Sequence, residues 1–380
     1  VSANDISWFV LYDKIMEAYH MSGLLDHLKQ QISADGAVTV ANYMTECLAN
    51  PEYGYYILNE PFGVSGDFVT APEISQMFGE LLGLWAVHQW HAMDKPKSFN
   101  LIELGPGRGT LMSDALRAAG GLPEFMAGLN VHLVETSRRL RGFQKQALNP
   151  FSPSWHDEIS SLPDGPFIVI ANEFFDALPI HQFEYTEYGW LERRVGVADG
   201  QLAFTPWPSS FSIEADVSSA GQPRIGDIFE VSPESREIVS ELAARCKLQP
   251  GCALFIDYGH SRSGFGDTLQ AVKAHAYADV LKTPGDADLT AHVDFEALAK
   301  SAARAGAIAY GSELQCQFLK ALGIHERTDI LSARATPDQL AQLKSGRDRL
   351  IGGDQMGNLF KVLAIASPDL PPPSGFQVNA

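Results

Sequence analysis

The chain has 380 residues, of which 45% are hydrophobic, and a formal net charge of −18. This length suffices for one large α/β domain with insertions or for two ordinary domains, and the charge makes nucleic acid a poor first choice of partner. Four cysteines without a CxxC pair are too few for a disulfide framework and favour a reducing compartment, and no run of 18 apolar residues indicates a membrane span.

Two helical patterns occupy residues 5 to about 49, the second of them from Val40 to Leu48, and predict an N-terminal helical cap. A stretch rich in Gly and Pro, residues 59–70, leads into a helix that is expected to continue to about Trp90. Thr70 and Glu73 have the spacing of a capping box at the start of this helix.

From residue 99 onward, short β-rich runs alternate with helical patterns, which is typical of βαβ units around a parallel sheet. Strands are expected at residues 100–104, 131–135, 154–156, 168–171 and 253–257. Residues 180–204 instead predict an antiparallel insertion with a hairpin turn at Asp199-Gly200. Helices are expected at 293–305 and 337–344, a last strand at 358–365, and a frayed tail from Pro368 onward.

The sharpest local signal follows the first of these strands, where Gly105, Gly107 and Gly109 precede Thr110. Glycine lets a backbone turn directly from strand to helix and lets a ligand approach it closely. The GxGxG spacing does not meet the GxGxxG fingerprint of dinucleotide sites. Glu103, two residues before the first glycine, suits the ammonium or sulfonium of S-adenosyl-L-methionine (SAM) better than a pyrophosphate. SAM is therefore the predicted cofactor, although a tight turn without a ligand also fits the isolated motif.

Four further residues are candidates for the cofactor site. Glu135 ends the second strand, where a carboxylate can accept hydrogen bonds from both ribose hydroxyls, a device that NAD sites share. Asp157 follows the third strand and is assigned to the adenine amino group. Asp67 and Thr70 lie in a segment interpreted as a loop over the cofactor, but a plain connection ending in a helix cap explains these two residues equally well.

The strand at 168–171 delivers polar and aromatic residues to the carboxyl edge of the sheet, where open α/β folds bind ligands. Glu173 and Asp176 can stabilise a cationic methyl acceptor, and Asn172 can hold an amine or guanidinium nitrogen. Phe174 and Phe175 can contact a cation through their faces. The alternative interpretation is that the polar residues cap a turn and that the two phenylalanines are core.

The remaining candidates for the site are several histidines and the end of the strand at 253–257. The segment 257–260 is expected to close the pocket rim, and His292 fits either a helix start or a functional position. His88 and His91 lack partners at ligand spacing, so we predict no metal site.

Segments 66–68, 70–78, 103–110, 172–179, 257–260 and 290–295 together resemble the MidA family, the protein arginine methyltransferases that act as mitochondrial complex I assembly factors. The resemblance spans about residues 36–362, and the helical segment before about residue 30 departs from it. It implies a class I SAM-dependent methyltransferase fold, which is α/β and Rossmann-like with a mostly parallel seven-stranded sheet, an N-terminal helical cap and an inserted antiparallel β/helical region.

The expected division of the chain follows from this fold. It comprises a helical cap with the cofactor-covering loop (1–95), a SAM-binding core (96–179), an inserted β/helical substrate region (180–250), the remainder of the core (251–367) and a tail (368–380). The resemblance also places the acceptor site in the loop at Asn172 and Glu173.

The activity that the resemblance implies is symmetric dimethylation of an arginine in a subunit of NADH:ubiquinone oxidoreductase, in the mitochondrial matrix of a eukaryote or the cytoplasm of a bacterium. The partner is then a protein, without membrane insertion, and the oligomeric state, including a homodimer, stays open. Two other functions are left open: a SAM-binding assembly chaperone without essential catalysis, and a nicotinamide oxidoreductase, which the glycine spacing disfavours.

Overall fold

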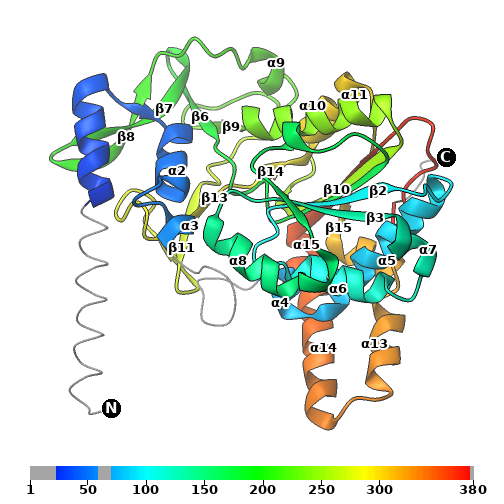
Figure 1. The fold of residues 1–380 in the computed structure, drawn as a ribbon. Helices are drawn as coiled ribbons and strands as arrows, with labels where there is room; N and C mark the ends of the chain where they lie inside the picture. Colours follow the sequence, from blue (N-terminus) through cyan, green and yellow to red (C-terminus); the bar gives the residue numbers. More distant parts are fainter. Residues whose placement is uncertain (1–22, 59–69, 377–380) are drawn as a thin grey trace, which may run out of the picture.

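A computed structural model describes residues 23–58 and 70–376 (Figure 1). Its centre is a sheet with seven strands in the order β15-β16-β10-β5-β2-β3-β4, and the short β14 (Val293–Asp294) pairs with β10. The bounds of the seven are β2 Phe99–Leu104, β3 Leu129–Val134, β4 Ser154–His156, β5 Phe167–Asn172, β10 Gly251–His260, β15 Ile308–Leu314 and β16 Phe360–Ala366. β16 runs antiparallel to both of its neighbours, while the other pairs on this path are parallel. The predicted sheet is confirmed.

Helices cover both faces of this sheet, which explains why its strands read as continuous apolar runs. Along β5, Ile168 and Ile170 belong to one core and Val169 to the other. The first core includes residues of α5 (Gln76–Ala92), α6 (Thr110–Ala119), α7 (Pro123–Gly128), α12 (Gln315–Ala321), α13 (Ile324–Ser332) and α14 (Pro337–Ile351). The second includes residues of α10 (Pro233–Leu248) and α11 (Phe295–Ala305). Thus α10, although it lies within the segment expected to be the insertion, packs on the central sheet.

The insertion forms a second sheet in the order β1-β7-β6-β9, with β8 paired to β7. Its strands are β1 Val38–Thr39, β6 His181–Thr186, β7 Gly189–Ala198, β8 Gln201–Trp207 and β9 Ile228–Val231. The expected hairpin turn is confirmed, because β7 and β8 are antiparallel and both Asp199 and Gly200 have positive φ angles of 50° and 76°. Because β1 belongs to the N-terminal cap, the cap and the insertion share one sheet.

A third core joins segments that are far apart in the sequence. It combines the helical residues 23–35, α2 (Val40–Ala49), α3 (Tyr55–Leu58) and β7 with a small sheet in the order β12-β11-β13. The strands of this sheet are β11 Gln270–Lys273, β12 Ala276–Ala278 and β13 Asp288–Thr290. The pattern at Val40–Leu48 therefore does mark a helix of the cap, whereas the pattern in residues 5–22 lies outside the described residues.

Three local expectations are wrong. Within the described residues Thr70 makes no capping hydrogen bond, and the Glu73 carboxylate instead accepts a hydrogen bond from Thr110 Oγ1 (2.5 Å), so no capping box forms. The predicted single helix is broken at Ser75 into α4 (Ala71–Ile74) and α5. The segment from Pro368 to residue 376 is not frayed either, because Trp85 Nε1 donates to the carbonyl of Ser374 (3.1 Å) and the Phe376 ring packs on Phe318.

Candidate functional site

The glycine turn between β2 and α6 has the geometry that its sequence predicts. Gly105, Gly107 and Gly109 have φ angles of +60°, +52° and +82°, which residues other than glycine rarely adopt. A Cβ on Gly105 would lie 2.8 Å from Phe174 Cδ2, so glycine is also required for close packing against the next loop. Gly109 is the N-cap of α6, so the turn leads directly into a helix N-terminus.

Glu103 ends β2 beneath this turn and is 3% exposed. Burial raises the pKa of its carboxyl to about 8, a hydrogen bond from the Met112 amide opposes the rise, and the charge of Glu135 adds to it. Its Oε2 is buried without a hydrogen-bond partner among the described residues. A buried carboxylate oxygen without a partner fits a cationic ligand that donates hydrogen bonds in this cleft.

Glu135 follows β3 and is also buried. Its Oε1 accepts a hydrogen bond from the amide of Ser137 (2.8 Å), and its Oε2 accepts one from Gln144 Nε2 (3.1 Å). Burial raises the pKa of Glu135, while these donors lower it. A carboxylate has about four lone pairs, so capacity for two hydroxyl groups remains.

The other predicted cofactor residues are placed differently. Thr70 and Thr110 line the same cleft as Glu103. Asp157 directly follows β4, but its side chain is 81% exposed and forms an ion pair with Arg141 (2.6 Å). Asp67 lies outside the described residues. The structure therefore gathers Glu103, the glycine turn, Thr70 and Thr110, while the assignment of Asp157 to adenine stays a prediction.

The loop after β5 brings Asn172 and Glu173 into that cleft. Glu173 has a φ angle of +51°, a strained conformation for a residue with a side chain. Its Oε1 accepts hydrogen bonds from the amide of Ala71 (3.0 Å) and from Asn172 Nδ2 (3.1 Å). Burial raises the pKa of Glu173 to about 7. Asn172 Oδ1 is a second buried atom without a partner within the described part of the chain.

Asp257 lies in β10, directly after the stretch that pairs with β5, and holds this loop in place. Its Oδ2 accepts hydrogen bonds from three successive amides, those of Phe174 (3.2 Å), Phe175 (3.0 Å) and Asp176 (3.2 Å). The side chain is fully buried, and burial together with the nearby carboxylates raises its pKa, which hydrogen bonds from the amides of Asp176 and Tyr258 oppose. Asp257 therefore fixes the backbone that carries Glu173. Sequence analysis placed this residue only at the pocket rim.

Asp176 lies behind the cleft and not in its lining. It forms a side-chain hydrogen bond with Tyr258, and burial raises its pKa to about 6. A second buried pair, in which Tyr56 donates to Asp288 Oδ1 (2.9 Å), lies close enough for Asp176 to raise the pKa of Tyr56. Asp176 thus extends the negative charge behind Glu173 toward the third core.

Gln144 was missed by sequence analysis. It is the fully buried residue of the polar helix α8 (Arg138–Ala147) that contacts both Glu135 and the carbonyl of Gly107. A glutamine in a run of basic and polar residues reads as a solvated surface residue, so the sequence carries no signal for this position.

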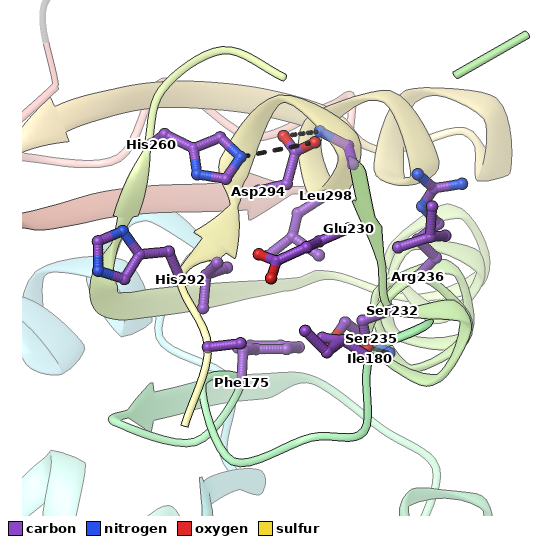
Figure 2. Close-up of a pocket in the computed structure, with 14 residues that line it drawn as sticks. Phe175, Ile180, Glu230, Ser232, Ser235, Arg236, His260, His292, Asp294 and Leu298 are labelled. Carbon is purple, nitrogen blue, oxygen red and sulfur yellow. Dashed lines mark hydrogen bonds and ion pairs between the residues drawn. The ribbon is translucent and has the colours of Figure 1, made fainter. Parts of the chain in front are cut away.

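A second pocket is lined by Phe175 and Ile180 from the two ends of the same loop and by the N-termini of α10 and α11 (Figure 2). Glu230 accepts hydrogen bonds there from Gln182 Nε2 (2.7 Å) and the Thr268 amide (3.0 Å). Asp294 caps α11 and lies 3.9 Å from His260 Nε2, while Arg236 turns away from Glu230 and pairs with Asp216 (2.9 Å). His292 precedes β14 and also lines this pocket, so it is not a residue of α11.

No group of three His, Cys, Asp or Glu side chains in residues 23–58 and 70–376 is arranged to hold a metal ion. The four cysteines are unpaired and buried. No helix in the described part of the chain is long and apolar enough to cross a membrane.

The first cleft fits SAM in its donor set. Glu103 Oε2 and Asn172 Oδ1, which have no hydrogen-bond partner among the described residues, can accept hydrogen bonds from an ammonium group, and Gly105 and Gly107 line the same cleft. Glu135 offers acceptors for ribose hydroxyls at the tip of the neighbouring strand.

Comparison with known proteins agrees with this fit. Residues 81–312 match the sequence model of a family described as S-adenosyl-L-methionine-dependent methyltransferase. The chain is 40% identical to "Protein arginine methyltransferase NDUFAF7, mitochondrial" of Danio rerio, covering 90% of this chain and 86% of that protein. The Homo sapiens protein of the same name is 38% identical, with 90% and 83% covered. A protein from Burkholderia thailandensis, crystallised with S-adenosyl-homocysteine, has a TM-score of 0.81 and 26% identity, covering 94% of this chain and 95% of that one.

Proposed function

The chain belongs to the family of SAM-dependent methyltransferases that includes the animal NDUFAF7 proteins, and we propose that it methylates an arginine side chain of another protein. The observation that carries this proposal is the position of Glu173, whose half-buried side chain shares one cleft with Glu103 and the glycine turn. Glu173, the acid proposed to act on the methyl acceptor, and Glu103, the acid proposed to bind the cofactor, therefore line the same cleft.

The residues that line the cleft, together with the neighbouring Gly109 and Glu135, have distinct roles in this proposal. Glu103, Glu135 and the turn at Gly105, Gly107 and Gly109 hold the cofactor, and Thr70 and Thr110 border it. When bound, SAM supplies an electrophilic methyl group on a sulfonium. Asp157 and Asp67 remain assigned to the adenine and to the covering loop as parts of the proposal.

Glu173 and Asn172 act on the acceptor. A guanidinium stays protonated in water, so an acid must draw its charge to one side and leave one nitrogen exposed to the methyl group. Because the pKa of Glu173 is raised to about 7, this carboxyl is available near neutral pH both as a negative charge and as an acceptor for the proton that the guanidinium loses on methylation. The charge of Asp176, buried behind it, contributes to the raised pKa of Glu173.

The proposed acceptor protein is a core subunit of NADH:ubiquinone oxidoreductase, and the proposed product is symmetric dimethylarginine. Names of relatives from several animals place those proteins in mitochondria. The corresponding compartment for this chain is the mitochondrial matrix if its source is a eukaryote and the cytoplasm if it is a bacterium.

The test of this function is Glu173→Gln, assayed by mass spectrometry of complex I subunits after expression in cells that lack the native protein. We expect SAM affinity close to wild type and methylarginine reduced by roughly 100-fold or more, since loss of an acid–base group typically costs that much. Glu187→Gln, in the turn of the insertion between β6 and β7, is the control. Normal methylation by Glu173→Gln would show that the role assigned to this residue is wrong.

A second variant separates catalysis from a chaperone function. A valine at Gly107 adds a branched side chain at a φ angle of +52° and is expected to block the cofactor cleft. If Gly107→Val no longer binds SAM but complex I still assembles, assembly depends on the protein and not on methyl transfer.

A further inference from the structure

Gln144 has three hydrogen bonds although it lies in a helix of mostly polar, solvated residues. Its Nε2 donates to the carbonyl of Gly107 (2.8 Å) and to Glu135 Oε2 (3.1 Å), and its Oε1 accepts from Trp155 Nε1 (2.8 Å). The side-chain amide can have only this orientation, because the reverse one would point an N–H group at the indole N–H and an oxygen at two acceptors.

These contacts come from the ends of three adjacent strands. Gly107 follows β2, Glu135 follows β3, and Trp155 belongs to β4. The carboxyl ends of neighbouring parallel strands are where open α/β folds bind a nucleoside. The backbone of α8 is also close to the glycine turn, since a Cβ on Gly109 would lie 3.4 Å from the Cα of Gln144.

We propose that Gln144 is a positioning residue for the adenosine half of SAM, which sets the Gly107 carbonyl and the Glu135 carboxylate relative to each other. Without it, Glu135 would keep its bond from the Ser137 amide to Oε1 (2.8 Å) but would lose the bond that holds Oε2. The Gly107 carbonyl and the Trp155 indole would each lose a buried partner. This inference rests on SAM as cofactor and not on arginine as acceptor.

The first test is Gln144→Met, which keeps a similar side-chain volume and removes all three hydrogen bonds. Calorimetry with SAM, S-adenosyl-homocysteine and adenosine is expected to show a loss of affinity of roughly tenfold or more for each ligand. The factor should be the same for adenosine as for SAM, because the effect lies in the nucleoside half. Gln146→Met, two residues along the same helix at an exposed position, is the matched control and should leave all three affinities unchanged.

The second test is Gln144→Glu, which keeps the acceptor for Trp155 and replaces the two donors by a carboxyl beside Glu135. At the high-pH end of the titration, where the introduced carboxyl ionises, it faces two acceptors and repels Glu135, so the affinity for adenosine should be lowest there. When that carboxyl is protonated it can donate one hydrogen bond, so the ratio of wild-type to variant affinity should shrink as the pH falls. Arg141, whose charge lowers the pKa of Glu135, is present in both proteins and does not change the comparison.

Equal adenosine affinities of Gln144→Met and wild type would overturn the proposal, even if the thermal unfolding temperature of the variant fell, because Gln144 would then only fill space. Should Gln144→Met fail to fold, the proposal is tested by the pH dependence of the adenosine affinity of Gln144→Glu. A ratio that does not change with pH would refute the role of the two donated hydrogen bonds.

Discussion

Replacement of Glu103 by glutamine keeps the shape of this side chain and removes its ability to ionise. The folded protein raises the pKa of Glu103 from 4.5 to about 8, mainly through burial of a side chain that is 3% exposed. Between these two pH values the folded state therefore holds a proton that the unfolded chain has released. For an acid whose pKa is raised on folding, stability is highest at low pH and is lost as the pH rises toward the folded pKa.

The size of the effect follows from the shift. With about 1.4 kcal/mol for each pKa unit, the raised pKa of Glu103 lowers the free energy of unfolding by about 3.5 kcal/mol as the pH rises from 5 to 8. This is an upper limit, because water that enters the cleft reduces the cost of burying the charge. Glu103→Gln lacks this cost, so its stability relative to wild type should rise by up to that amount over the same pH range.

Urea unfolding followed by circular dichroism at the two pH values measures the difference directly. Contributions of Glu173, Asp176 and other acids cancel, since both proteins contain them. Glu124→Gln, at a side chain that is 79% exposed, should show the same difference from wild type at both pH values. A stability difference for Glu103→Gln that does not change with pH would refute the reasoning. The same variant should bind SAM more weakly, which means that a stabilising substitution costs cofactor affinity.

Two further outcomes are expected. Calorimetry of SAM binding near pH 7, in buffers with different ionisation enthalpies, should show release of close to one proton, because a bound cation lowers the raised pKa of Glu103; a heat independent of the buffer would contradict this. Asp257→Asn removes the carboxylate shared by three loop amides, so kcat should fall by roughly tenfold or more while the Kd for SAM stays within about threefold. A parallel loss of SAM affinity in Asp257→Asn would show that this residue supports the whole sheet edge and not the acceptor loop alone.

The central sheet could be predicted from the sequence because its strands are buried on both faces. Continuous apolar runs such as residues 168–171 have no solvated side, and they are separated by helical patterns of ordinary length. The glycine turn was recognisable for a related reason, since three positive φ angles in five residues leave little choice but glycine.

The third core could not be predicted in the same way. β1 has two residues, and β11 and β12 have four and three, too few for a periodic pattern. These strands exist because the fold places them beside other strands. The failed capping box has a comparable cause: Thr70 and Glu73 have the right spacing, but Thr110, distant in sequence, takes the Glu73 carboxylate.

The site shows the same limit. Glu103 lies next to the last residue of a strand, and Glu135 and Glu173 directly follow strands, so all three could be proposed from their positions alone. The roles of Gln144 and Asp257 depend on hydrogen-bond partners from other helices, strands and loops, so only the three-dimensional arrangement reveals these roles.

The shared core of the N-terminal cap, the insertion and the small sheet gives the molecule two parts that can vary separately. Ala287, Leu289 and Ala291 belong to this third core, whereas Leu101, Leu111 and Leu133 beneath the nucleoside side belong to the first. Because the two cores share no residue, a substitution inside the third core is expected to alter the packing of the cap and the insertion and to leave the packing beneath the glycine turn unchanged.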